Sequence, residues 1–115
     1  MKFNCEVRYL KPTSVLVRLR GVLDAGTSLE LENSLGGVLK DQAVKKIIME
    51  VPELSFISSS GLRVIMLIIK SLAPKNGKLY MVGAAAQIVG LIKMSGMTKW
   101  VTLKENLLDC ENERS

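Results

Sequence analysis

Three consecutive serines, Ser58, Ser59 and Ser60, are the residues of this sequence best placed to do chemistry. They follow a short apolar run and precede Gly61 and a second apolar stretch, which predicts a turn that opens a helix. The first N–H groups of a helix have no partner within it, and a serine there caps one of them or holds a phosphate beside them. Because one cap needs one serine, three in a row indicate a further role at a surface.

A serine nucleophile is the alternative chemistry for the same turn. Such enzymes need a general base, most often histidine, and many present the serine in a Gly-x-Ser-x-Gly turn. This sequence has no histidine and no Gly-x-Ser-x-Gly segment. We therefore predict that the protein is not an enzyme.

Metal and cofactor chemistry have no support in the sequence. Cys5 and Cys110 stand near opposite ends of the chain and form no Cys-x-x-Cys pair, and imidazole ligands are absent. We predict no metal, no cofactor and two free thiols, with a disulfide between the two cysteines as the less favoured alternative.

Apolar runs predict five strands. Val15, Val17 and Leu19 alternate with other residues, which is the period-two pattern of a half-buried strand. Residues 45–51 form a nearly continuous apolar run that suits an inner strand ending before Pro52. The predicted strands are residues 3–10, 14–20, 45–51, 78–82 and 100–103.

Apolar residues at helical spacing predict three helices and a final helical turn. Thr27 and Glu30 match a capping box, so we place the start of the first helix at Thr27. Gly36-Gly37 is expected to end this helix early or to pack closely, because glycine weakens a helix. The predicted helices are residues 27–39, 61–72 and 84–95, and the turn is at residues 107–108.

The order of these elements, β-β-α-β-α-β-α-β-α, predicts an α/β fold. Strands that alternate with helices indicate a mainly parallel sheet with right-handed crossovers, and the first hairpin adds an antiparallel edge. A chain of 115 residues has room for one such core. We predict one domain over residues 1–110, with a mixed, mainly parallel sheet of about five strands and four helices, and a flexible tail over residues 111–115.

The formal net charge of +5 raises the question of an acidic partner. The basic residues are scattered along the sequence without a basic run or interleaved aromatic residues, so we predict no binding to nucleic acid. The longest apolar stretch, residues 62–69, is interrupted by Arg63 and is far shorter than a membrane span. Residues 1–6 do not form a signal peptide. We expect a cytoplasmic protein without direct membrane insertion.

The helix expected after the serines is apolar on almost every side. One stripe is enough to face the sheet, and it consists of Leu62, Ile65, Met66 and Ile69. The remaining apolar residues, Val64, Leu67 and Ile68, are then left for a neighbouring helix or a partner protein.

The segment from Leu54 to Leu62 resembles the signature of the STAS family, the anti-sigma factor antagonists of bacteria, in which an apolar pair precedes Asp-Ser-Ser-Gly-Leu. Gly21-Val22-Leu23-Asp24 is similar to the Gly-x-Leu-Asp that follows the second strand of the family. Ser95-Gly96 is similar to the Ser-Gly that closes its third helix. Together with the order of elements, the resemblance covers about residues 5–108.

This resemblance implies a partner-switching protein. In the family, the dephosphorylated antagonist binds an anti-sigma factor that is also a serine kinase, and so frees the sigma factor. The kinase phosphorylates the first serine of the motif, which is Ser59 here, and a serine phosphatase reverses the reaction. Ser58 stands where the family has aspartate. This departure bears on kinase recognition and leaves Ser58 and Ser60 as second choices for phosphorylation.

The expected partner-binding surface is centred on the serine turn. It comprises Asp24, Ser58, Ser59, Ser60, Gly61, Leu62 and Arg63. Two of these residues have an ordinary structural alternative, Asp24 as the cap of the first helix and Arg63 as a solvated side chain. The alternative function is that of a STAS accessory or scaffold subunit in a transporter or stress-signalling complex, without phosphorylation.

Overall fold

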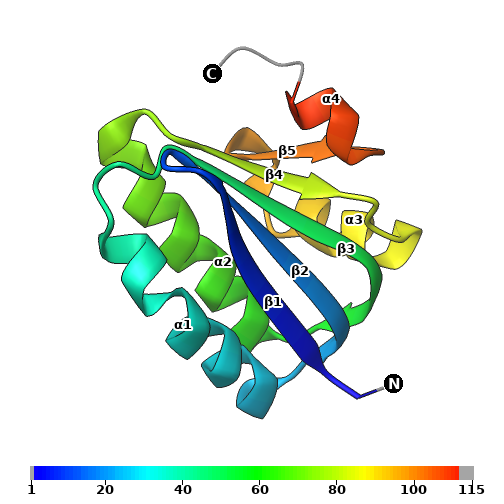
Figure 1. Ribbon diagram of the computed structural model, residues 1–115. Helices are drawn as coiled ribbons and strands as arrows, with labels where there is room; N and C mark the ends of the chain where they lie inside the picture. Colours follow the sequence, from blue (N-terminus) through cyan, green and yellow to red (C-terminus); the bar gives the residue numbers. More distant parts are fainter. Residues whose placement is uncertain (1, 112–115) are drawn as a thin grey trace.

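The computed structural model describes residues 2–111. Its five strands form one sheet in the order β1-β2-β3-β4-β5, in which β1 is antiparallel to β2 and every other neighbouring pair is parallel. The predicted mixed, mainly parallel sheet is thereby confirmed (Figure 1). The strands are β1 (Asn4–Lys11), β2 (Ser14–Leu23), β3 (Lys46–Ile57), β4 (Lys78–Val82) and β5 (Val101–Lys104).

Four α-helices alternate with these strands in the predicted order. They are α1 (Ala25–Lys40), α2 (Ser59–Leu72), α3 (Ala86–Met94) and α4 (Leu107–Glu111). Two short 3₁₀ turns, η1 (Ala73–Lys75) and η2 (Met97–Lys99), follow α2 and α3. The tail predicted over residues 111–115 lies outside the described residues except for Glu111, which ends α4.

Helices cover both faces of the sheet, one face more completely than the other, so the core has a larger and a smaller part. The larger part lies between the sheet and α1, α2 and α3, and it includes fully buried Val15, Val17 and Leu19. The three residues of β2 that the period-two pattern placed on one face are therefore buried together, as predicted. A smaller cluster under α4 on the opposite face contains Leu16, Ile48, Tyr80, Val82 and Cys110.

Charged pairs link β1, β2 and β3 on another part of this second face. Arg18 donates to Glu50 over 2.7 Å and lies 3.7 Å from Glu6, and Arg20 donates to Glu53 over 2.6 Å. These side chains point away from the core because they alternate with the buried residues of β2.

The first helix begins earlier than predicted, and its cap is Asp24 rather than Thr27. The Asp24 carboxylate accepts from the Thr27 backbone N–H over 2.9 Å, and the Thr27 hydroxyl accepts from the Asp24 backbone N–H over 2.9 Å. This reciprocal pair is the capping box, shifted three residues upstream of the predicted one. Gly36-Gly37 neither ends α1 nor packs closely, since the helix continues to Lys40 and both glycines face open space.

Strand β3 is longer than predicted because Pro52 does not end it. The register to β2 shifts between Arg18 and Arg20, so an irregularity accommodates the proline. On the other side of β3, the pairing with β4 stops at Glu50. The missing N–H of Pro52 therefore removes no bond to β4, and the strand continues to the serine turn.

Helix α2 is rotated relative to the predicted stripe. Val64, Ile65, Ile68, Ile69 and Leu72 are buried, whereas Leu62 and Met66 are only partly buried. The reason is that α1 packs beside α2, so that α2 buries one flank against α1 as well as one against the sheet. The Ser71 hydroxyl donates to the Leu39 carbonyl of α1 over 2.8 Å and fixes this contact.

Three further observations concern the described residues 2–111. No helix in them is both long and apolar enough to cross a bilayer. Their acidic and cysteine side chains form no group of three that could hold a metal ion. Cys5 is partly buried, Cys110 is buried, and both are free thiols.

Candidate functional site

Ser58 joins the end of β3 to the start of α2. Its backbone N–H donates to the Leu23 carbonyl of β2 over 2.8 Å, and its carbonyl accepts from the Leu62 N–H over 3.0 Å. Its hydroxyl oxygen accepts from the Gly61 N–H over 3.2 Å, which makes Ser58 the cap of α2. The turn is therefore fixed to the sheet at its first residue.

Gly61 allows the first turn of α2 to approach the sheet closely. A Cβ atom at this position would lie 2.7 Å from Ile57 Cγ2 and 3.0 Å from Leu23 Cβ. Leu23 and Ile57 are paired across β2 and β3, so the helix starts directly above the last pair of these strands. Any larger residue would push the helix start, and the serines with it, away from the sheet.

Ser59 and Ser60 are the first two residues of α2. Ser59 is exposed and Ser60 is partly exposed. Neither hydroxyl has a hydrogen-bond partner among residues 2–111. Their backbone N–H groups belong to the helix start, where no intrahelical acceptor exists and the helix dipole favours an anion. The geometry suits a hydroxyl that another molecule reaches or modifies.

Asp24 lies beside this turn because Leu23 is paired with Ile57 across β2 and β3, and Asp24 and Ser58 are the next residues of the two strands' chains. It caps α1, so the structural alternative for this residue is confirmed. Its carboxyl pKa is lowered, first by the backbone N–H of Thr27 and then by the Thr27 hydroxyl. The side chain is nevertheless exposed, so the charge that caps α1 is also presented to solvent.

Arg63 projects from the first turn of α2 and is tied to α1. Its guanidinium group donates to Glu32 over 2.8 Å, and both side chains remain partly or largely exposed. The structure thus brings all seven predicted residues, Asp24 and residues 58–63, to one end of the domain. We call these seven residues the serine face.

Sequence reasoning missed two exposed apolar side chains near the serine face. Phe56 is 49% exposed and precedes Ser58 by two residues, and Leu29 is 56% exposed and lies one helical turn before Glu32. Phe56 lies beyond the predicted end of its strand at residue 51, so no side-chain direction was predicted for it. Leu29 lies within the predicted helix over residues 27–39, and both residues fall outside the buried positions of their elements.

Comparison with known proteins decides the family. Residues 6–110 match the STAS domain family. The chain belongs to this family. The match covers the sheet, α1, α2 and α3, and the serine face of this STAS domain lies entirely within it.

Two curated relatives of the STAS domain carry the same kind of name. A putative anti-sigma factor antagonist, BtrV of Bordetella bronchiseptica, is 28% identical over 78 residues, which are 68% of this chain and 66% of that protein. An anti-sigma F factor antagonist of Paenibacillus polymyxa is 27% identical over 99 residues, which are 86% of this chain and 85% of that protein. Both of these similar proteins are thus named as anti-sigma factor antagonists.

A solved structure confirms the fold. SpoIIAA, a Bacillus cell fate determinant solved in its phosphorylated form, superimposes with a TM-score of 0.77 over 95% of this chain and 97% of that chain. The two sequences are 19% identical. The STAS domain therefore has the α/β architecture that the sequence predicts.

Proposed function

We propose that this STAS domain is an anti-sigma factor antagonist that binds an anti-sigma factor through its serine face and is released when Ser59 is phosphorylated. The observation that carries the proposal is the position of Ser59, whose exposed hydroxyl lies at the start of a helix and has no hydrogen-bond partner among the described residues. The names of the curated relatives support the class of partner. The protein acts by binding and not as an enzyme.

The domain itself can hold a phosphate at Ser59 without rearrangement. The oxygens would face the free N–H groups at the start of α2, and the positive end of the helix dipole stabilises an anion there. The Ser58 cap and the close contact at Gly61 fix this end of the helix to the sheet. The effect of the phosphate therefore falls on the partner and not on the fold.

The charge of the phosphate is large enough to act as a switch. A phosphoserine carries about −1.5 to −2 charges at pH 7. Opposite one carboxylate of the partner at about 6 Å, with an effective dielectric constant near 20, it would cost roughly 4–5 kcal/mol before salt screening. A loss of about 4 kcal/mol is roughly a thousandfold in affinity. A partner surface that is apolar or acidic satisfies this requirement.

The surroundings of the three serines favour Ser59 as the acceptor. The Ser58 hydroxyl oxygen is engaged with the Gly61 N–H, and Ser60 is less exposed than Ser59. Ser58 occupies the position of the aspartate in the family motif, and serine and aspartate are both good helix caps. The departure from the motif thus preserves the start of α2 and removes a carboxylate beside the acceptor.

The proposed partner is an anti-sigma factor with serine kinase activity, and a serine phosphatase is the second partner. Because such a kinase uses ATP, we place the switch in the cytoplasm. The apolar side chains of Phe56 and Leu29 would enlarge the contact beyond the serine face. Exposed apolar side chains beside a binding surface add apolar area that a protein partner can cover.

The direct test is incubation of the purified domain with candidate anti-sigma kinases and ATP, followed by mass mapping of residues 54–70. Phosphate should appear on Ser59, persist in Ser58→Ala and Ser60→Ala, and vanish in Ser59→Ala. Phosphorylation of Ser59→Ala at the wild-type level would remove Ser59 from the proposal. A pull-down that recovers a transporter ATPase and no serine kinase would favour the accessory-subunit alternative.

A further inference from the structure

The lysines that are scattered in the sequence lie together in space. The parallel strands begin, and α1, α2 and α3 end, at the end of the domain opposite the serine face (Figure 1). We call the lysines gathered there the lysine end. They are Lys11, Lys40, Lys45, Lys46, Lys70, Lys75, Lys78, Lys93 and Lys99.

The lysine end accounts for the positive charge of the chain. In the part of the chain that the structure describes, the acidic residues at this end are Asp41 and, in α4, Asp109 and Glu111. The rest of the sequence holds seven basic and eight acidic residues, so its net charge is slightly negative. The Asp41 carboxylate is already engaged, since it accepts from the Tyr9 hydroxyl over 2.8 Å and from the Ala43 N–H over 3.0 Å.

Five of these lysines have an ordinary explanation. Lys40, Lys70 and Lys93 stand in the last turns of α1, α2 and α3, and Lys75 and Lys99 end η1 and η2. A cation there is stabilised by the negative end of a helix dipole. The other four lysines lie at or next to strand ends, where no helix dipole stabilises a cation. They are Lys11, Lys45, Lys46 and Lys78.

Three of these four lie in one row across the sheet. Lys46 is directly opposite Lys78, and Ser14 lies opposite both Lys11 and Lys46. Like charges on directly opposite residues of neighbouring strands are destabilising. The Lys46 ammonium group donates to the Cys110 carbonyl over 3.0 Å and lies 5.4 Å from the centre of the Tyr80 ring, so the groups that hold it are neutral.

A hollow beside the row can take an anionic group. Its volume is about 390 Å³, and it is lined by Thr13, Ser14, Lys45, Lys46, Lys75 and Asn76. Lys75 is held in place because its ammonium group donates to the Asp41 carbonyl over 3.0 Å. Three lysines and two hydroxyl-bearing residues line this hollow, and a lining of this kind is suited to a phosphate group.

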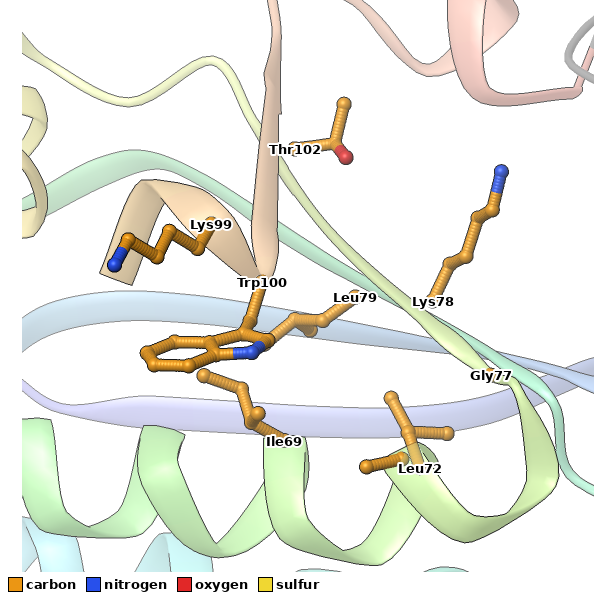
Figure 2. A pocket seen from close by; sticks show the side chains of 9 residues that line it. Ile69, Leu72, Gly77, Lys78, Leu79, Lys99, Trp100 and Thr102 are labelled. Atoms are coloured by element: carbon orange, nitrogen blue, oxygen red, sulfur yellow. The ribbon is translucent and has the colours of Figure 1, made fainter. Parts of the chain in front are cut away.

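Apolar side chains are exposed at the same end. Tyr9 is 47% exposed, Leu10 38% and Trp100 50%. Figure 2 shows the Trp100 ring lying across Ile69 in a shallow groove of about 210 Å³, while Lys78 and Lys99 reach away on either side. Tryptophan and tyrosine favour the boundary between lipid and water, where lysines meet anionic headgroups.

We propose that the lysine end docks this domain on an anionic lipid bilayer, with headgroup phosphates at the hollow lined by Lys45, Lys46 and Lys75 and with Trp100 at the interface. Nucleic acid fits less well. Among residues 2–111, this end contains no arginine, the residue that recognises bases and phosphates with two bonds, and its helices present C-termini, which repel phosphate. A domain docked in this way keeps its serine face on the side away from the bilayer. The docking proposal therefore does not depend on the proposed switch.

The test compares two triple variants that lose the same charge. Lys11→Gln/Lys45→Gln/Lys78→Gln removes exposed lysines of the lysine end, and Lys2→Gln/Arg8→Gln/Lys104→Gln removes three basic groups elsewhere. Binding is measured to vesicles of equal parts phosphatidylglycerol and phosphatidylcholine, and to phosphatidylcholine alone. Trp100 is the single tryptophan, so its fluorescence reports docking without a label.

Wild type should bind the anionic vesicles with a blue shift of Trp100 emission and should ignore the neutral ones. A lysine near an acidic surface strengthens binding by roughly fivefold, so the lysine-end variant should bind on the order of 100-fold more weakly. The control variant should lose much less. Equal losses in the two variants, an unshifted Trp100 spectrum, or tighter binding to a DNA duplex than to the vesicles would overturn the proposal. Ser59→Asp should bind vesicles as wild type does, which separates this proposal from the switch.

Discussion

The Ser58 backbone N–H donates to the Leu23 carbonyl over 2.8 Å, and this bond places the starts of two helices side by side. Asp24 follows Leu23 and caps α1, and Ser58 caps α2. Two helix N-termini therefore meet at one point of the surface, next to the exposed hydroxyl of Ser59. Negative charge is stabilised within the domain at such a point, while a partner placed over it would meet that charge directly.

Asp24 has two roles that substitutions can separate. Asp24→Ala should destabilise the domain by about 1 kcal/mol, because the cap of α1 is lost, whereas Asp24→Asn keeps a good cap and should change stability little. Because the pKa of Asp24 is lowered in the folded state, its contribution is present above the usual carboxyl pKa of about 3.9 and is lost as the pH falls through the lowered value. Urea unfolding at neutral and acidic pH measures both effects.

The same pair of variants tests the partner contact of Asp24. If the carboxylate touches the anti-sigma factor, Asp24→Asn should weaken binding although its fold is intact. Unchanged binding by Asp24→Asn would show that the cap of α1 is the whole role of this residue.

The Arg63–Glu32 pair links α2 to α1 but adds little stability. An exposed ion pair is worth less than about 1 kcal/mol, and salt screens it. A double-mutant cycle with Arg63→Gln and Glu32→Gln should give a coupling energy below about 1 kcal/mol that falls further at high salt. A coupling of several kcal/mol would mean that this pair, and not the packing of α1 on α2, holds the two helices together.

Gly61 is predicted to be essential for the position of the serines. Gly61→Ala places a methyl group 2.7 Å from Ile57 Cγ2, so the start of α2 must shift. Overpacking of this kind costs about 1–3 kcal/mol, which chemical denaturation would detect. Gly90→Ala is the matched control, since a Cβ atom there meets open space. Equal stability of Gly61→Ala and wild type would contradict the close contact.

Ser28 is a buried polar residue whose hydroxyl group is left unsatisfied within residues 2–111. Its side chain is 1% exposed, and its hydroxyl has no hydrogen-bond partner among the described residues. A buried polar group left unsatisfied costs about 1–3 kcal/mol. Ser28→Ala should therefore stabilise the domain, by roughly 1 kcal/mol and several degrees in melting temperature. A lower melting temperature would indicate that the hydroxyl has a partner, such as an ordered water.

Local patterns predicted most of the architecture. The strand from Lys78 to Val82 has the predicted bounds because charge and glycine flank a short apolar run. The hairpin turn at residues 12–13 and the end of α2 before Pro74 follow from the backbone limits of proline. The predicted start of α1 was wrong because Asp24-x-x-Thr27 and Thr27-x-x-Glu30 are both capping patterns. The choice between them depends on where β2 ends, and β2 ends at Leu23, directly before Asp24.

The features that depend on neighbouring elements could not be predicted in this way. The buried side of α2 is set by α1 as well as by the sheet. The sequence of α2 alone does not show on which side α1 packs. The gathering of the lysines follows from the parallel topology, which brings Lys11, Lys46 and Lys78 into one row. The serine turn was identified because its three hydroxyls are adjacent in sequence, whereas Leu29 reaches the same surface only through folding.

The most direct test of the switch is the affinity of the anti-sigma factor for four forms of this domain, measured by titration calorimetry. Wild type and Ser59→Ala should bind equally well, because the serine hydroxyl is not needed for the unmodified contact. Ser59→Asp, and wild type phosphorylated at Ser59, should bind much more weakly, with the full phosphate giving a loss of up to about a thousandfold. Equal affinity of all four species would contradict the account, because negative charge at Ser59 would then have no effect on the partner.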